Sequence, residues 1–155
     1  MSLESVRQHF EDLALDLTII ETSEETSTVE SAARVLGVEA AHIAKTLAFR
    51  LADPTVILLV TRGDARIDNV KFKQRFGKAR MLAPGDVELL TGHPVGGVCP
   101  FGLRAPLPVY ADVSMRVFDR VYPAAGSRNS ALCIAPSALA QLTGATWVDV
   151  CRIPG

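Results

Sequence analysis

Ile43-Ala44-Lys45-Thr46-Leu47-Ala48-Phe49-Arg50-Leu51 has the pattern of a β-strand around which the rest of the chain is organised. Side chains of a strand alternate between two faces, so one face carries Ile43, Lys45, Leu47, Phe49 and Leu51. Its four large apolar side chains predict that the fold buries this face. A buried ammonium without a partner costs on the order of several kcal/mol or shifts its pKa. Lys45 therefore either reaches out to solvent at the strand end or lines a pocket.

Turn and capping residues predict the elements on both sides of this strand. Ala52-Asp53-Pro54 has turn chemistry and leads to a second apolar strand at 55–61, which predicts a β-hairpin. Further strands are expected at 18–20, 81–82, 107–111, 131–135 and 146–150. Helices are expected at 2–15, 27–36, 69–76, 84–90, 114–118 and 136–142. This irregular alternation predicts a single α+β domain over residues 1–155, with a mixed sheet.

Two of these helices have clear starting signals. Ser27 followed by Glu30 forms a capping-box pattern, and Asp68 can cap the helix that begins at Asn69. In the helix from Asn69, the spacing of Val70, Phe72, Phe76 and the Lys73 stem predicts an inward face. Gly37 and Gly77 are expected to end the two helices.

Composition narrows the class of protein. The chain has 155 residues and a formal net charge of −1, with no basic segment followed by an apolar core at its start. The aliphatic run Val56–Val60 is too short to span a bilayer. The three cysteines and three histidines are widely scattered, so no zinc or other metal site is expected. A reducing, cytoplasmic location is expected.

Basic residues crowd into one segment. Arg66 and the set Lys71, Lys73, Arg75, Lys78 and Arg80 are opposed only by Asp68 within 15 residues. Such a cluster can meet phosphate groups. The alternative interpretation is an ordinary solvated helix face.

Two small-residue loops could carry chemistry. In Gly96-Gly97-Val98-Cys99-Pro100, free N–H groups could bind an anion or an oxyanion, although the loop could also be only a tight turn. Cys99 could be a nucleophile if a base lay beside it, or an inert small residue. The second loop, 126–129, holds Ser127, whose hydroxyl could orient a water. The Arg128 guanidinium in this loop could bind a phosphate or carboxylate group through two hydrogen bonds, or Arg128 could belong to a surface turn.

Four segments together resemble a known family. They are Ala41-His42-Ile43-Ala44-Lys45-Thr46-Leu47, Thr61-Arg62-Gly63-Asp64, Val95-Gly96-Gly97-Val98-Cys99-Pro100-Phe101-Gly102 and Ala125-Gly126-Ser127-Arg128. In this order the chain resembles the YbaK / prolyl-tRNA-synthetase-associated editing domain family, from about residue 18 to residue 150. The Lys-Thr strand combined with a Gly-x-x-x-Pro loop is fairly specific.

The resemblance implies a mixed, strongly curved sheet flanked by helices, and a trans-editing hydrolase that deacylates mischarged aminoacyl-tRNA. It implies that Lys45 is essential and that Gly96–Pro100 is the family's loop, with no metal or organic cofactor. The implied substrate is a tRNA, commonly that for proline, carrying a wrong small amino acid. The resemblance also implies prolyl-tRNA synthetase as a partner. It implies no binding to DNA or to a membrane.

Site residues follow from these observations and the resemblance together. Catalytic roles are expected for Lys45 and for the N–H groups of Gly97, Val98 and Cys99, which would stabilise an oxyanion while water attacks. Contacts with the substrate are expected from Thr28, Thr46, Gly96, Pro100, Phe101, Gly126, Ser127 and Arg128. Contacts with tRNA are expected from Lys71, Lys73, Arg75, Lys78 and Arg80.

The chain departs from the family pattern at positions that line the expected pocket. Ala124 and Ala131 stand where cysteine-editing members carry a serine and an aspartate, Cys99 stands where serine is common, and Thr28 replaces an aromatic residue. These differences leave the amino acid removed undetermined, with Cys, Ala, Ser, Thr and others open. A non-catalytic module that binds a tRNA end or aminoacyl adenosine is the alternative function.

Overall fold

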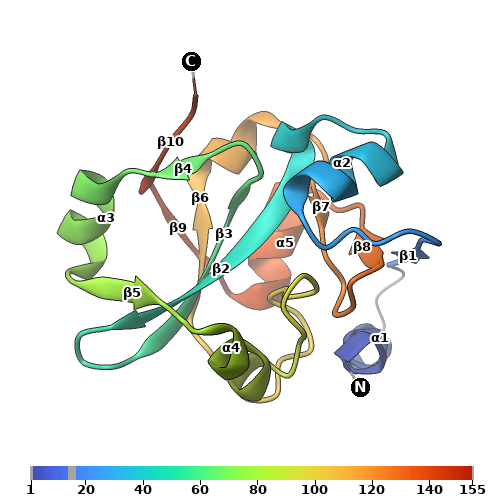
Figure 1. Cartoon of the computed structure of the whole chain (residues 1–155), viewed down its shortest axis with the longest axis horizontal. Helices are drawn as coiled ribbons and strands as arrows, with labels where there is room; N and C mark the ends of the chain where they lie inside the picture. Colours follow the sequence, from blue (N-terminus) through green and yellow to red (C-terminus); the bar gives the residue numbers. More distant parts are fainter. Residues whose placement is uncertain (1, 14–16, 155) are drawn as a thin grey trace.

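The computed structural model describes residues 2–13 and 17–154, and the predicted hairpin lies at its centre (Figure 1). Strand β2 (Ile43–Leu51) pairs antiparallel with β3 (Val56–Arg62), with Leu47 opposite Leu59. The hairpin is closed by Asp53, whose carboxylate accepts a hydrogen bond from the Thr55 N–H at 2.7 Å. The turn chemistry of 52–54 therefore predicts this connection correctly.

Four more strands complete a six-stranded mixed sheet. Its order is β5-β2-β3-β6-β9, and β7 pairs with β2 on the β5 side. β5 (Ala79–Met81) is antiparallel to β2, whereas β7 (Tyr122–Pro123) is parallel to it. β6 (Val109–Asp112) and β9 (Thr146–Val148) extend the sheet in parallel beyond β3. The mixed sheet is confirmed, and its strong curvature stays a prediction.

Two small antiparallel sheets lie outside the main one. β1 (Ile19–Glu21) pairs with β8 (Ser130–Leu132), and β4 (Arg66–Ile67) pairs with β10 (Cys151–Arg152). The first fixes the segment before helix α2 against the second small-residue loop. The second ties the β3–β4 turn to the end of the chain.

Five α-helices and two short 3₁₀ segments flank the sheet in the described ranges. The helices are α1 (Ser2–Asp12), α2 (Val29–Leu36), α3 (Asn69–Phe76), α4 (Pro84–Thr91) and α5 (Pro136–Thr143), and the 3₁₀ segments are η1 (Ala40–His42) and η2 (Val113–Val117). The predicted end of the first helix, Leu15, lies outside the described residues. None of these helices has the length and apolar character needed to cross a membrane.

The predicted cap of α2 is wrong by one residue. Thr28 is the N-cap, and its hydroxyl accepts from the Ser31 N–H at 3.1 Å while Ser31 Oγ accepts from the Thr28 N–H. The pattern fits both registers, because Ser27-x-x-Glu30 and Thr28-x-x-Ser31 each place two hydroxyl or carboxyl groups three residues apart.

The fold covers both faces of β2 rather than one. Ala44 and Ala48 belong to a large core built with α1, α4, α5 and the segment around Phe101. Phe49, on the other face, belongs to a smaller core with Phe72 of α3. The alternation of side chains along β2 therefore predicts correctly which residues share a face. The face that carries Lys45 is the one covered by α3 and β4.

Candidate functional site

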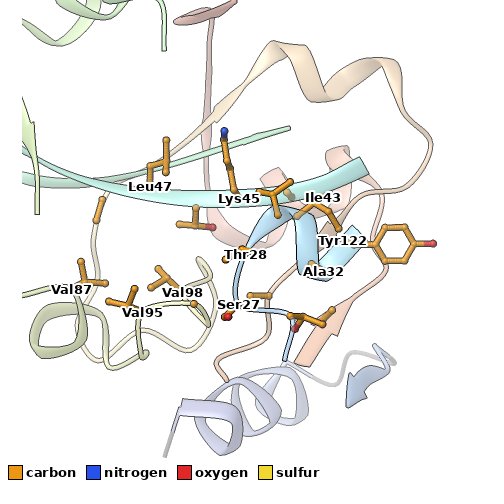
Figure 2. A pocket seen from close by; sticks show the side chains of 18 of the residues that line it. Ser27, Thr28, Ala32, Ile43, Lys45, Leu47, Val87, Val95, Val98 and Tyr122 are labelled. Atoms are coloured by element: carbon orange, nitrogen blue, oxygen red, sulfur yellow. The ribbon is translucent and has the colours of Figure 1, made fainter. Parts of the chain in front are cut away.

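A cavity of about 330 Å³ opens between β2, α2, α4, the Gly96–Pro100 loop and the residues Ala124, Ser130 and Ala131 on either side of the second loop (Figure 2). Most of its lining is aliphatic: Val29, Ala32, Leu36, Ile43, Ala44, Leu47, Ala48, Met81, Leu82, Val87, Val95, Val98, Ala124 and Ala131. The polar side chains in the lining are Thr26, Ser27, Thr28, Lys45, Thr46, Tyr122 and Ser130. No Asp, Glu or His lines this cavity among the described residues. It therefore suits a ligand with a small apolar part.

The floor of the cavity is an unpaired length of strand edge. On the edge of β2 away from β3, β7 pairs with Ile43 and Ala44, and β5 pairs only from Phe49 onward. The last bond before the gap is Leu82 N–H to Ala48 O, 3.0 Å. Between these points Thr46 has no strand beside it in the described part of the chain.

Lys45 lines the cavity but its ammonium is held on the other side of the strand. Nζ donates to Ala65 O at 2.7 Å and to Gly63 O at 3.2 Å. Figure 2 shows the amine projecting away from Val95 and Val98. Burial lowers the Lys45 pKa, although nearby Asp64 favours the charged form. The side chain is half-buried, so it does not extend into bulk solvent.

The turn that holds Lys45 is rigid for local reasons. Arg62 and Asp64 form a two-pronged salt bridge at 2.7 and 2.9 Å, which lowers the pKa of the Asp64 carboxyl. A Cβ on Gly63 would lie 2.2 Å from Ala40 O, so only glycine fits there. The turn over residues 61–65 thus presents the carbonyl oxygens of Gly63 and Ala65 in a fixed position to the lysine.

The two small-residue loops pack directly against each other. Gly126 N–H donates to Gly97 O at 3.0 Å, and Arg128 Nε donates to Val95 O at 3.0 Å. The Gly97 N–H is itself bonded to Pro94 O, 2.9 Å away. Gly97 is therefore not an available oxyanion donor in this conformation. The N–H groups of Gly96 and Val98, both lining residues, have no partner within the described ranges.

The structure brings together only part of the predicted catalytic and substrate-contact residues. Thr28, Lys45, Thr46, Gly96 and Val98 line the cavity, whereas Gly97, Cys99, Pro100, Phe101, Gly126, Ser127 and Arg128 do not. Phe101 is fully buried in the core against Phe10, with ring centroids 5.2 Å apart. Ser127 Oγ is engaged with Ser130 Oγ at 2.7 Å.

Cys99 and His93 do meet, but inside the protein. Cys99 Sγ lies 3.6 Å from His93 Nε2, and neither side chain is exposed. Burial raises the pKa of the Cys99 thiol to about 12, so a thiolate is disfavoured. His93 Nε2 donates to Phe101 O at 2.7 Å, which leaves Nδ1 as a buried acceptor with no partner in the described chain. This geometry opposes a nucleophilic role for Cys99.

The buried His93 predicts acid-sensitive stability. Burial lowers its pKa below the ordinary 6.5, so below pH 6.5 the unfolded chain takes up a proton that the native state does not. The free energy of unfolding should fall by up to about 1.4 kcal/mol per pH unit until the native pKa is reached. Urea unfolding of wild type and His93→Gln between pH 7.5 and 5.5 measures the difference in slope. Equal slopes for the two proteins would contradict this prediction.

The predicted basic cluster is exposed, but its members differ. Lys71 Nζ forms a salt bridge with Asp149 at 3.0 Å, which raises the Lys71 pKa. The Arg75 guanidinium lies 5.0 Å from the Phe76 ring centroid and 5.3 Å from that of Tyr110. The predicted inward face is wrong for Val70 and Lys73, which are exposed. α3 covers the sheet face opposite the Gly96–Pro100 loop. No member of the cluster lines the cavity, and Arg80 adjoins it only through its neighbour in β5, the lining residue Met81.

Sequence reasoning missed the aliphatic walls from α2 and α4, and also Arg50. Arg50 lies opposite Arg80 in the β2–β5 register and shares its strand face with Thr46. Within the described residues there is no group of three or more His, Cys, Asp or Glu side chains that could hold a metal ion.

Comparison with known proteins places the chain in a family. Residues 23–142 match the model of the aminoacyl-tRNA editing domain, and the chain belongs to this family. It is 49% identical over 154 residues to "Uncharacterized protein YwhH" of Bacillus subtilis, covering 98% of each chain. It is 29% identical over 130 residues to "Putative Cys-tRNA(Pro)/Cys-tRNA(Cys) deacylase EbsC" of Enterococcus faecalis, covering 83% of this chain and 79% of that one.

A solved structure agrees with this assignment. The crystal structure of "a putative trans-editing enzyme for prolyl tRNA synthetase" aligns with a TM-score of 0.88 at 31% identity, covering 99% of this chain and 98% of the other. The predicted YbaK-type editing family and its mixed fold are thereby confirmed.

Proposed function

We propose that the protein hydrolyses the ester that joins a wrongly attached small amino acid to the 3′ end of a tRNA. The observation that carries this proposal is the single aliphatic cavity shared by Lys45, Thr46 and the loop residues Gly96 and Val98. Membership of the editing-domain family supports the reaction class. The relatives named for Cys-tRNA(Pro) deacylation and for prolyl-tRNA synthetase trans-editing support tRNA for proline and a partnership with its synthetase.

The chemistry requires orientation and charge stabilisation more than a strong base. An aminoacyl ester is already activated, so a held water and hydrogen-bond donors at the carbonyl oxygen suffice. The Val98 N–H, unpartnered among described residues and in the lining, is the loop donor that we assign to that oxygen. Water is the nucleophile, helped by the tRNA 2′-hydroxyl or by a polar substrate side chain. No cofactor is needed for this step.

Lys45 then acts on the nucleic acid rather than on the ester. Its ammonium has three donors, two of which go to Gly63 O and Ala65 O. The third has no partner in the described part of the chain and is assigned to a phosphate oxygen of the terminal nucleotide. An amine on the far side of β2 from Val98 fits this role better than polarisation of the ester carbonyl (Figure 2).

The lining indicates a small side chain on the substrate. Ala32, Ala124 and Ala131 leave space without polar groups. Where related proteins would use a serine and an aspartate, Ala124 and Ala131 offer no hydrogen bond. Alanine therefore ranks first among the four candidate amino acids, ahead of cysteine, serine and threonine.

Deacylation of four misacylated prolyl tRNAs tests the proposal. Ala-, Cys-, Ser- and Thr-tRNA for proline are incubated with wild type, and Pro-tRNA serves as the cognate control. We expect hydrolysis of at least one wrong ester well above the spontaneous rate, with Pro-tRNA spared. Binding of all five tRNAs without turnover would contradict the deacylase function and favour the alternative, a non-catalytic module that binds the tRNA end.

The basic cluster predicts an unequal contribution to tRNA affinity. Arg80→Gln should raise KM for the preferred misacylated tRNA about 3- to 10-fold with little change in kcat, because Arg80 adjoins the cavity and faces Arg50. Lys71→Gln is the matched control and should change KM less than 2-fold, since Asp149 already neutralises Lys71. Steady-state kinetics at 0.1 M salt measure KM and kcat of both variants. An equal rise in KM for Arg80→Gln and Lys71→Gln would contradict the prediction that the tRNA lies closer to Arg80 than to Lys71.

A further inference from the structure

Thr46 carries a polar side chain that lines the cavity and has no hydrogen-bond partner among the described residues. Five other polar lining side chains have partners in the described chain: Thr26 with Arg128 O, Ser27 with Glu25, Thr28 with Ser31, Lys45 with Gly63 O and Ala65 O, and Ser130 with Ser127. The hydroxyl of the remaining one, Tyr122, points away from the other labelled lining residues (Figure 2). Thr46 Oγ1 is buried and has no partner in the described chain. A buried hydroxyl without a partner is costly, so its presence in an apolar cavity requires an explanation.

The main-chain N–H and C=O of Thr46 also have no partner within residues 2–13 and 17–154. Leu51 N–H donates to Thr55 O at 2.8 Å, so odd-numbered residues of β2 direct their main-chain groups to β3. Even-numbered residues face the outer edge, as the bond from Leu82 N–H to Ala48 O shows. Thr46 falls in the gap between β7 and β5, with both its N–H and its C=O on that edge.

One residue thus offers a donor and two acceptors at the floor of the cavity. An aminoacyl ester presents the complementary set, because its α-amino group donates and its carbonyl oxygen accepts. This is the exchange of two hydrogen bonds that a residue of a neighbouring antiparallel strand would make. Alternation places the Thr46 side chain on the same face as Ala44 and Ala48, towards the loop that contains Val98.

We propose that the aminoacyl group binds at Thr46 as a one-residue β-strand. The Thr46 N–H donates to the ester carbonyl oxygen opposite the Val98 N–H, and the Thr46 C=O and Oγ1 accept from the α-amino group. The amino-acid side chain then enters the aliphatic part of the cavity. This inference rests on the proposed deacylase function and specifies the group that the site recognises.

The described lining contains no carboxylate side chain that could pair with the α-amino group of the substrate. The α-amino group meets only neutral acceptors, and the hydroxyl of Thr46 is the one that a substitution can remove. Recognition therefore depends on the α-amino group itself, and esters that lack it should be poor substrates even when their side chain fits.

The experiment compares the fastest wrong ester of the panel with the same ester lacking its α-amino group. The matched pairs are alanyl and propionyl, cysteinyl and 3-mercaptopropionyl, seryl and 3-hydroxypropionyl, and threonyl and 3-hydroxybutyryl. Each rate is divided by the spontaneous rate, which removes the difference in ester reactivity. Wild type should prefer the aminoacyl ester by more than about 10-fold in kcat/KM.

Thr46→Val, which keeps the shape of the side chain, should lower kcat/KM about 10-fold for the aminoacyl ester and less than 2-fold for its des-amino partner. Thr46→Ser, which keeps the hydroxyl, should retain most of the wild-type kcat/KM for the aminoacyl ester. Equal wild-type rates on the two esters, or an equal loss on both in Thr46→Val, overturns the inference while leaving the deacylase function intact. Failure to hydrolyse any wrong ester removes the deacylase function and this inference with it.

Discussion

Gly97→Ala is expected to reduce deacylation at least 100-fold and to destabilise the protein. A Cβ at this position would lie 2.7–2.8 Å from the C, N and O atoms of Ser127, all of them main-chain atoms. The two loops would have to move apart, which strains the bond from Gly126 N–H to Gly97 O. Overpacking of this kind costs about 1–3 kcal/mol, and a shift of about 1 Å in a site can cost about 100-fold in rate.

Gly85→Ala is the matched control for this substitution. Gly85 lies in the first turn of α4, and a Cβ there meets nothing within 4 Å. It should keep the wild-type rate and gain up to about 1 kcal/mol of stability, since alanine loses less chain entropy than glycine. Urea unfolding and kcat/KM on the preferred misacylated tRNA measure both variants. A wild-type rate in Gly97→Ala would show that the contact between the loops does not position the site.

Local signals predicted the elements that local chemistry determines. Helix α3 has the predicted bounds, Asn69–Phe76, because the Asp68 carboxylate accepts from the Val70 and Lys71 N–H groups and Gly77 ends the helix at a positive φ of 73°. The hairpin around Asp53 was predictable for the same reason. The family resemblance, which depends on four short segments, is also confirmed.

Features that depend on distant segments were not predictable in the same way. The paired strands β4 and β10 have two residues each and lie far apart in the chain, so no local pattern marks them. Val70 occupies a helical position that suggests burial, yet it is 67% exposed because α3 packs through Phe72 and Phe76. The open edge at Thr46 exists only because β7 and β5 stop on either side of it, which is a property of the whole sheet.

The position of Lys45 illustrates both situations. Parity correctly placed it on the face of Phe49, but an α-helix on that face and loops on the other could not be inferred from one strand. The ammonium is satisfied by the carbonyl groups of Gly63 and Ala65, which the sequence places near β2 only through the register of the hairpin. The sequence therefore singles out Lys45 as a candidate residue and leaves the direction of its side chain undetermined.

Lys45→Met is expected to lower kcat/KM for misacylated tRNA at least 100-fold, and mainly through KM. It should also lose about 1 kcal/mol of stability, because two carbonyl oxygens lose a half-exposed charged donor. If the third ammonium donor binds a phosphate of the single-stranded 3′ end, the slope of log(kcat/KM) against log[salt] should become less negative by about 0.7. Lys71→Met, at a lysine already paired with Asp149, is the matched control and should change the rate less than 2-fold.

Shortening the substrate separates the two roles that Lys45 could have. On an aminoacyl adenosine, which carries no phosphate, wild type and Lys45→Met should differ less than 3-fold, because the amine projects away from the Val98 loop where the ester is held. The kcat/KM of wild type should itself be much lower on this short substrate than on the misacylated tRNA, because the phosphate contact is no longer made. If Lys45→Met instead loses as much activity on aminoacyl adenosine as on tRNA, the ammonium must act at the ester. Lys45 would then have to leave Gly63 O and Ala65 O and turn around the open edge of β2 when the substrate binds.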